Sequence, residues 1–353
     1  MSEDLIKRKL DHINICLEKQ VEARKSTLFE CVHLIHNALP ELNLDSIDTS
    51  TLFLNHKFSA PILIDAMIGG SSESLRMNEN LALAAEELKL GMVVGSQRAG
   101  LSSPSLAETY SIVRKKAPNI FLASNIGATQ LLEGFGKEEA KKCIDMIGAN
   151  AFVIHLNPLQ EAIQVGGEPQ YEGVIKKIHE LITQLSIPVI VKEVGFGISK
   201  EVAIKLEIAG VSAINISGSG GTSWSAVEHY RALALDDKEK SELGQLFWDW
   251  GIPTAVSLIE TRRTVKIPII ASGGIRTGLD IAKSLVLGAN LTGMALPLLK
   301  HAAISKDSLV SFLQKVIHEL KTAMFAVGCS NIQSMRRVRF VITGELAEWL
   351  RWS

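Results

Sequence analysis

The sequence has few of the features that mark secreted, membrane or nucleic-acid-binding proteins. Its four cysteines form no CxxC pair and no zinc-type spacing, so we expect reduced thiols in a cytoplasmic protein. No apolar run approaches the ~18 residues of a membrane helix, and residues 1–4 are too acidic for a signal peptide. A net charge of −1 provides no field that attracts nucleic acid or lipid. We therefore expect no nucleic-acid or membrane partner, and any charged ligand must be held by a local site.

Aromatic residues are also scarce, at 5%, whereas 46% of the chain is hydrophobic and 27 residues are glycine. An aliphatic core of this kind is typical of parallel sheets covered by helices. From residue 61 onward, a short apolar run, a glycine- or serine-bearing turn and a helix-periodic stretch repeat eight times. This pattern predicts an α/β fold, a closed (β/α)8 TIM barrel; an open doubly wound sheet is the alternative, but no GxGxxG turn supports it. The predicted strands lie at residues 62–65, 92–94, 120–123, 151–154, 188–191, 213–216, 268–271 and 291–294.

The N-terminal segment predicts a helix ahead of the barrel. Apolar residues at steps of three and four, from Ile6 to Val21, indicate an amphipathic helix over residues 5–25. Residues 26–58 are irregular, with a short strand expected near 52–54. We expect one domain over residues 1–353, with residues 1–58 as an N-terminal extension that contributes to the substrate site.

An insertion is predicted at residues 223–264, after the sixth strand. Its charged run, residues 236–240, predicts a solvated loop. Its tryptophans, Trp224, Trp248 and Trp250, suit a subunit contact if exposed or a lid if buried. Beyond residue 299 we expect helices that close the barrel.

Polar or glycine-rich residues follow the first seven predicted strands, at the end where barrel enzymes keep their chemistry. The stretch 155–161 is the most informative, because it places an imidazole, two amides and a carboxylate after one buried strand. Gly273 and Gly274 follow the seventh strand, where such barrels bind phosphate. These residues are also compatible with plain turns.

Cationic residues near these strand ends predict two anion-binding sites. Arg98, Lys192 and Arg276, with the basic N-terminal helix, would neutralise one phosphate group of a cofactor and one of a substrate. Glu161 would hold a Mg²⁺ ion between phosphates, or alternatively favour a helix start. His155 would act as an acid or base, or only hydrogen-bond a ring.

The chain resembles the type II isopentenyl diphosphate isomerases, flavin-dependent enzymes with an FMN-binding (β/α)8 barrel. The most specific motifs are His-Leu-Asn-Pro-Leu-Gln-Glu at 155–161 and Gly-Gly-Thr-Ser-Trp at 220–224. Ile68 is a departure, since the family usually has threonine there, and a hydroxyl contact with the flavin is lost. The matching stretches, spread over nearly the whole chain, are residues 8–13, 94–98, 125–128, 155–161, 192–195, 217–224, 250–255 and 273–276.

The resemblance implies interconversion of isopentenyl and dimethylallyl diphosphate by a redox-neutral 1,3-allylic proton shift in isoprenoid biosynthesis. It implies FMN reduced by NADPH or NADH as the main acid/base, Mg²⁺ at Glu161, and a homotetramer or homo-octamer. The implied catalytic residues beside the flavin are His155, Asn157 and Gln160. The implied substrate-binding residues are Arg8, Lys9, His12, Ser96, Gln97, Arg98, Asn157 and Gln160. The implied FMN-binding residues are Ala66, Met67, Ile68, Ser96, Asn125, Lys192, Ser217, Thr222, Gly274, Ile275, Arg276, Ala295 and Leu296.

Two other functions fit part of the pattern. An FMN-dependent oxidase or dehydrogenase of a hydroxy acid or nucleotide would also explain Lys192 and the glycine turns. A non-catalytic flavin or phosphate binder on the same barrel is the third possibility, because fold alone does not establish chemistry. Neither explains a basic N-terminal helix combined with Asn157, Gln160 and Glu161.

Overall fold

The computed structural model describes residues 2–352 and contains a closed barrel of eight parallel strands. Successive strands are neighbours, and the barrel closes where β11 pairs with β4, with Thr292 opposite Ile62. The predicted (β/α)8 fold is therefore confirmed. The barrel strands are β4 (Ile62–Ile64), β5 (Gly91–Val93), β6 (Leu122–Gly127), β7 (Ala151–His155), β8 (Val189–Lys192), β9 (Ala213–Asn215), β10 (Ile269–Ala271) and β11 (Leu291–Met294).

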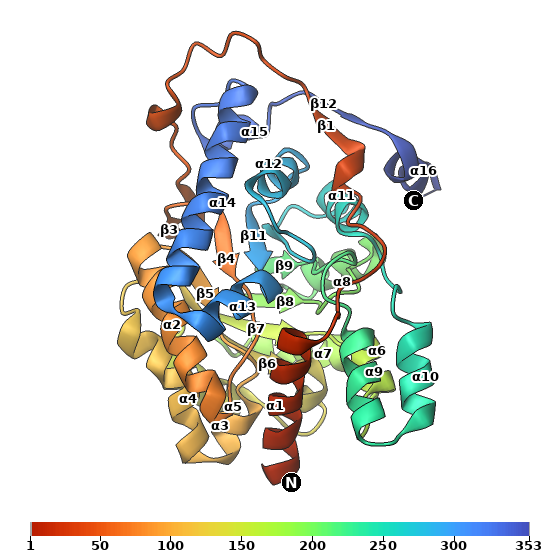
Figure 1. Ribbon diagram of the computed structural model, residues 1–353. Helices are drawn as coiled ribbons and strands as arrows, with labels where there is room; N and C mark the ends of the chain where they lie inside the picture. Colours follow the sequence, from red (N-terminus) through yellow and green to blue (C-terminus); the bar gives the residue numbers. More distant parts are fainter. Residues whose placement is uncertain (1, 353) are drawn as a thin grey trace.

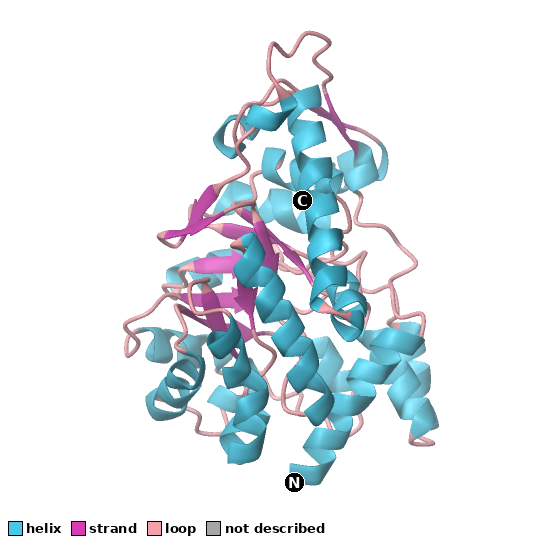
Figure 2. Ribbon diagram, turned by 60° about the vertical axis from the view of Figure 1, so that its left-hand side comes forward, coloured by secondary structure: helices cyan, strands magenta, loops and turns pink. Residues whose placement is uncertain are grey.

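Helices surround the strands, and the chain passes from strand to helix around the ring (Figures 1 and 2). The helices are α1 (Ser2–Glu18), α2 (Ser72–Leu88), α3 (Arg98–Ser102), α4 (Pro104–Lys116), α5 (Lys137–Ile147), α6 (Pro158–Ile163), α7 (Val174–Ile182), α8 (Lys200–Ile208), α9 (Trp224–Ala234), α10 (Lys238–Leu246), α11 (Thr254–Thr264), α12 (Gly278–Val286), α13 (Leu296–Ile304), α14 (Lys306–Ala326), α15 (Ile332–Met335) and α16 (Gly344–Trp352). Three single turns of 3₁₀ helix are η1 (Phe29–Cys31), η2 (Leu44–Ser46) and η3 (Ala128–Leu131).

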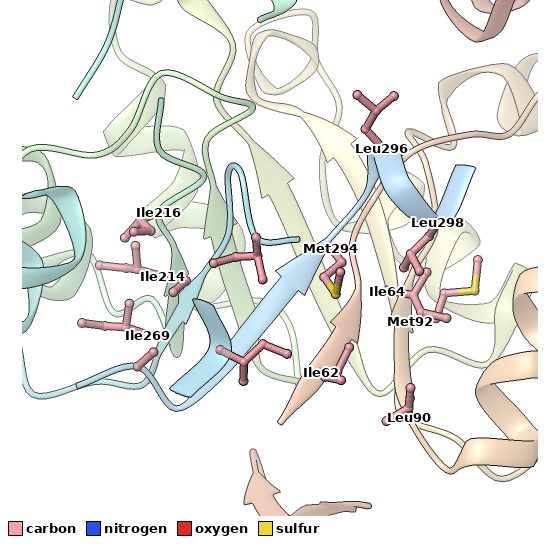
Figure 3. Packing of buried hydrophobic residues seen from close by; sticks show 14 of the residues in the cluster. Ile62, Ile64, Leu90, Met92, Ile214, Ile216, Ile269, Met294, Leu296 and Leu298 are labelled. Atoms are coloured by element: carbon pink, nitrogen blue, oxygen red, sulfur yellow. The ribbon is translucent and has the colours of Figure 1, made fainter. Parts of the chain in front are cut away.

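The strands are apolar on both faces because both faces are buried. Alternate residues of one strand point to opposite sides: Ile62 and Ile64 pack outward against the helices, whereas Leu63 points into the barrel. Figure 3 shows the outward layer, in which Ile62 and Ile64 lie near Met294 and Met92. Strands that are buried on both faces can therefore be predicted from continuous aliphatic runs.

A two-stranded hairpin covers the barrel at the end where the strands begin. It consists of β2 (Thr51–Phe53) and β3 (His56–Phe58), which confirms the strand expected near residues 52–54. Phe53, Phe58 and Phe121 pack with ring centroids 5.6 to 6.3 Å apart, in contact with the interior residues of the barrel. The scarce aromatic residues thus seal one end, and the opposite end stays open for a site.

The N-terminal helix is shorter than the sequence pattern indicated. Helix α1 ends at Glu18, and Val21 belongs to an extended segment instead. The backbone of that segment pairs with the loop after β9: Ala23 N donates to Gly221 O, and Ser223 N donates to Val21 O, both at 2.8 Å. Val21 is buried, and a buried apolar residue at this position is compatible with a helix as well as with an extended segment. Helix α1 lies against α9 and α13 at the open end of the barrel (Figure 1).

The segment after β9 adds two helices to the barrel. Helix α11 packs on α8 and β10 and so takes the ordinary barrel position, which leaves α9 and α10 as the extra elements. The expectation of a solvated loop at 236–240 is wrong, because Asp237 caps α10 by accepting a hydrogen bond from Lys240 N at 3.0 Å. Trp250 is 60% exposed but Trp248 only 6%.

The C-terminal segment closes the ring of helices and then leaves it. Helix α14 packs between α12 and α2, as expected for barrel closure. The last helix does not close the barrel, contrary to expectation: α16 packs on α11 and η1. Between them, β12 (Phe340–Ile342) forms an antiparallel pair with β1 (Val32–Leu34). Within residues 2–352, no helix is both long enough and apolar enough to cross a membrane.

Candidate active site

One large cavity occupies the open end of the barrel, where the carboxyl ends of all eight strands meet. It encloses about 1570 Å³, its open mouth included. Every residue that the sequence assigned to the site lines it, except Gln97 and Ile275. The assigned residues that line it are Arg8, Lys9, His12, Ala66, Met67, Ile68, Ser96, Arg98, Asn125, His155, Asn157, Gln160, Glu161, Lys192, Ser217, Thr222, Gly274, Arg276, Ala295 and Leu296.

A glycine turn after β10 forms one wall of the cavity. Gly273 and Gly274 have φ of +92° and +76°, in the left-handed region that favours glycine. A Cβ on Gly274 would overlap both Thr27 Cγ2 and Gly220 O. Thr254 Oγ1 donates to Gly273 O at 2.6 Å and holds the turn in place. The turn therefore leaves backbone and space where a phosphate group would approach.

Lys192 ends β8 as a buried cation in the floor of the cavity. Its Nζ donates one hydrogen bond, to Glu193 O at 2.7 Å, and lies 3.9 Å from Asp65 Oδ2. Asn215 Nδ2 donates to the same Asp65 oxygen at 2.9 Å, and Ser272 Oγ donates to Asn215 Oδ1 at 2.6 Å. Since an ammonium has three protons, Lys192 retains donors for a ring in the cavity. Asp65 was not among the predicted site residues, although it directly follows a strand.

His155 is held as a neutral imidazole. Burial, followed by the charges of Lys192 and Lys9, lowers its pKa to about 3. Asn125 Nδ2 donates to Val94 O at 3.1 Å, so its Oδ1 must accept from His155 Nδ1 at 3.0 Å. The proton therefore sits on Nδ1, and Nε2 is left as an acceptor. His155, which lines the cavity, therefore has no proton to deliver there.

Gln97 lies behind this pair and not in the cavity. Its side chain is fully buried, accepts from Asn125 N at 3.1 Å and donates to Cys143 O at 3.0 Å. Direct contact with substrate, as the resemblance implied, does not fit this position; Gln97 instead supports Asn125. Ile275 is also fully buried outside the cavity, so only its neighbours Gly274 and Arg276 reach the site.

Three side chains of the 155–161 stretch form a second wall. Asn157 Nδ2 donates to Glu161 Oε1 at 2.9 Å, and Gln160 Nε2 donates to Glu228 Oε1 at 3.1 Å. Glu161 Oε2 also accepts from Gln164 Nε2 and from Glu168 N. The Oε1 atom of Glu161 therefore keeps a lone pair for a cation.

Glu228 on α9 was missed because nothing in a helical stretch marks one carboxylate as functional. It is buried and lies 2.9 Å from His12 Nε2. Burial alone would raise its pKa, but His12, Gln160 and Arg231 outweigh that effect and lower the pKa of Glu228 below its ordinary value. Trp224, also on α9, meets the His12 ring edge-on at 5.2 Å.

Helix α1 supplies two cations with different surroundings. Lys9 Nζ donates to Gly69 O, Ser96 O and Tyr110 Oη at 2.8 to 3.0 Å, so its three protons are used. Burial lowers the pKa of Lys9 to about 7. Arg8 lines the cavity, and no described side chain or backbone group forms a hydrogen bond with its guanidinium. Arg8 is thus available to a ligand, whereas Lys9 attaches α1 to the loops after β4 and β5.

Arg98 stands at the mouth with two carboxylates. Its guanidinium lies 3.2 Å from Glu168 and 3.3 Å from Glu133. Glu161 and Arg98 both lie close enough to Arg8 to act on its pKa, so these three side chains border one side of the cavity, together with Asn157 and Gln160. This half suits an anion with a bound cation, and the half near Lys192 and the glycine turn suits a flat ring with a phosphate tail.

Comparison with known proteins decides between the candidate families. Residues 138–341 match the family model of FMN-dependent dehydrogenases. The isopentenyl-diphosphate delta-isomerase of Methanosarcina barkeri is 49% identical over 345 residues, which cover 98% of this chain and 94% of the relative. This chain belongs to the isopentenyl-diphosphate delta-isomerases. The relative of that name from Pyrococcus furiosus is 47% identical over 97% of this chain and 88% of its own length. The resemblance to the FMN-dependent, type II isomerases is confirmed.

Solved structures agree on the fold of this isomerase family member. A flavocytochrome b2 variant with sulfite bound superposes with a TM-score of 0.67 at 17% identity, over 92% of this chain and 81% of the other. Mandelate oxidase with (S)-2-phenylpropionate gives 0.63 at 17% identity, over 97% and 98%. At such identities the likeness shows the shared barrel alone.

Proposed function

We propose that this chain interconverts isopentenyl diphosphate and dimethylallyl diphosphate by a redox-neutral 1,3-allylic proton shift. The observation that carries the proposal is one cavity with two differently built halves. One half offers a glycine turn and the spare protons of Lys192; the other offers Arg8 and the lone pair of Glu161. This is the arrangement that FMN beside a diphosphate substrate requires.

The cavity fits FMN. The turn at Gly273 and Gly274 leaves no room for side chains but exposes backbone to a phosphate, and Arg276 lines the same region. Ile68, where the family usually has threonine, presents only carbon to the cavity, yet Ile68 O accepts from Gly95 N at 3.1 Å and keeps the loops joined. The backbone of this loop would therefore keep its place beside a bound ring.

Glu161 fits a Mg²⁺ ion that is shared with the substrate. Among the described residues, no group of three or more His, Cys, Asp or Glu side chains could hold a metal alone. Mg²⁺ commonly takes one carboxylate and completes its shell with phosphate oxygens and water. Glu161, with Asn157 and Gln160 beside it, would hold the ion, and Arg8 and Arg98 would neutralise the remaining charge of the diphosphate.

None of the three implied catalytic residues, His155, Asn157 and Gln160, supplies a suitable acid. An unactivated alkene needs a proton donor at carbon and a base nearby. The His155 proton is directed at Asn125, and Asn157 and Gln160 are amides. Reduced FMN supplies the acid and base when bound. The residues of the chain then exclude water, orient the alkene and hold the diphosphate.

The test is an assay of the purified protein with isopentenyl diphosphate, FMN, Mg²⁺ and NADPH. We expect product only when flavin is reduced, with no NADPH consumed in step with product. Steady NADPH consumption would indicate an oxidoreductase, and full turnover with oxidised flavin would contradict the proposed mechanism.

We further propose that the protein forms a homotetramer or homo-octamer and is located in the cytoplasm. Native mass spectrometry tests the assembly, and cell fractionation tests the location.

A separate variant tests whether Glu161 is a Mg²⁺ ligand. Replacing Glu161 by Gln keeps the size of the side chain but removes its negative charge and one acceptor oxygen, so the Mg²⁺ concentration needed for half-maximal rate should rise by at least ~10-fold. FMN affinity, measured by quenching of flavin fluorescence, should not change. Glu138→Gln, at an exposed position in the first turn of α5, is the matched control. An unchanged Mg²⁺ response in Glu161→Gln would contradict the ligand role.

A further inference from the structure

Tyr171, in the loop before α7, makes a two-point contact with Asn157. The phenol oxygen accepts from Asn157 N at 2.9 Å, and the phenol proton is donated to Asn157 Oδ1 at 2.8 Å. Burial raises the pKa of Tyr171, so the hydroxyl keeps its proton throughout the neutral range. Tyr171 does not line the main cavity; its ring borders a shallow apolar groove with Leu156 and Val174.

The contact decides which way the Asn157 amide points. An asparagine side chain has one oxygen and one NH₂ group, and either can face a given neighbour. Because the Tyr171 hydroxyl donates to Oδ1, the NH₂ group is turned toward Glu161 Oε1 at 2.9 Å and Gln160 Oε1 at 3.3 Å. One hydroxyl group thus fixes both the backbone and the side chain of Asn157.

Hydrogen-bonding partners behind a metal ligand set its orientation and its affinity. Glu161 receives hydrogen bonds from Asn157, Gln164 and the backbone of Glu168, and only the bond from Asn157 reaches Oε1. If Asn157 rotated, the oxygen atom that we assign to the metal would lose its only hydrogen-bond donor among the described residues.

We propose that Tyr171 is a positioning residue for the diphosphate site: it locks Asn157 so that Asn157 and Glu161 together receive a Mg²⁺-bound diphosphate. This inference deepens the proposed function and rests on it for the identity of the ligand. It assigns to Tyr171 no contact with substrate or flavin.

The test uses Tyr171→Phe, which keeps the ring and removes the hydroxyl. The matched control is Tyr230→Phe, because the Tyr230 hydroxyl has no hydrogen-bond partner among residues 2–352 and its ring packs on Trp248. Calorimetric titration of each FMN-loaded protein with inorganic pyrophosphate and Mg²⁺ measures the affinity of the diphosphate site without requiring turnover. We expect Tyr171→Phe to weaken binding about 10-fold and to leave FMN affinity unchanged, and Tyr230→Phe to match the unmodified protein.

A double-mutant cycle separates positioning from general packing. In an Asn157→Ala background, the Tyr171→Phe change should cause no further loss of pyrophosphate affinity, because its only route to the site is gone. Additive losses, or unchanged binding in Tyr171→Phe, would overturn the inference. Failure of the proposed function is distinguishable, since it would appear as missing isomerase turnover in the unmodified protein while the titrations still report the site.

Discussion

Arg276 donates two hydrogen bonds to Glu22 Oε1, from Nη2 at 2.6 Å and from Nε at 3.1 Å. The pair joins the segment that follows α1 to the loop after β10, at the border of the cavity where we place the phosphate of FMN. Glu22 thus neutralises the nearest arginine and adds a negative charge near an anionic ligand. The N-terminal segment and cofactor binding should therefore be linked through this ion pair.

Replacing Glu22 by Gln tests this link. The change removes one negative charge beside the phosphate and releases Arg276, so we expect FMN to bind several-fold more tightly, by about 1 kcal/mol or less. Fluorescence titration at two salt concentrations should show a steeper salt dependence than in the unmodified protein. Glu18→Gln, at an exposed position at the end of α1, is the control. Weaker FMN binding in Glu22→Gln would show that positioning of Arg276 matters more than charge.

The Gly274→Ala change should damage FMN binding. Alanine at φ +76° is strained, and its methyl group would overlap Thr27 and the backbone of Gly220. Gly166→Ala is a matched control, because Gly166 has φ +71° but nothing within 4 Å of the added Cβ. Gly166→Ala should lower the free energy of unfolding by about 1 kcal/mol. Gly274→Ala should lower it by more and also reduce FMN affinity at least ~10-fold; equal effects of the two variants would contradict the steric account.

Protonation of His155 should make stability depend on pH. Its pKa is lowered from 6.5 to about 3, first by burial, so below pH 6.5 the unfolded chain takes up a proton that the folded chain does not. This contribution to stability is complete above pH 6.5 and is lost as the pH falls toward 3. At pH 5 the loss is about 2 kcal/mol. Urea unfolding of the unmodified protein and of His155→Gln, at pH 7 and pH 5, measures it as the difference between the two pH effects. If both lose equal stability, the imidazole is not held neutral.

Lys9→Met should loosen α1. The lysine ammonium donates to two carbonyl groups and to Tyr110, and methionine can fill the space but donates nothing. We expect faster amide hydrogen exchange throughout α1 and a higher KM for the diphosphate substrate, because Arg8 and His12 are carried by the same helix. Lys7→Met, at an exposed position one residue before Arg8, should change neither. Unchanged exchange in Lys9→Met would mean that packing alone keeps α1 in place.

The repeated unit made the barrel predictable, because each strand is a short apolar run bounded by turns. The runs at 62–65 and 151–154 coincide with β4 and β7 within a residue or so, since strands buried on both faces need continuous aliphatic residues. Strand β6 extends to Gly127, beyond the predicted end at 123, and therefore includes Asn125. Neighbouring strands satisfy the amide of Asn125, and the sequence pattern alone could not show that such a polar residue belongs to the strand.

Several of the errors share one cause, which is a partner distant in the sequence. Val21 suited a helical stripe, but its backbone pairs with the loop after β9. Gln97 directly follows Ser96 at the rim, yet it turns away from the cavity toward Asn125. Glu228 and Tyr171 lie in unremarkable stretches and gain their roles only through His12 and Asn157. Local patterns predict which strand end a residue follows, but not the direction of its side chain.

Helix α1 is synthesised before all of the helices on which it packs, and two of them, α9 and α13, begin only at Trp224 and Leu296. The growing chain must therefore carry part of the amphipathic surface of α1 uncovered until nearly the whole barrel has left the ribosome. Arg8 reaches its place only at the end of that process. A prematurely terminated chain would have the helix that holds the diphosphate but no wall to place it against, so truncated products should neither sequester substrate nor compete with the finished enzyme.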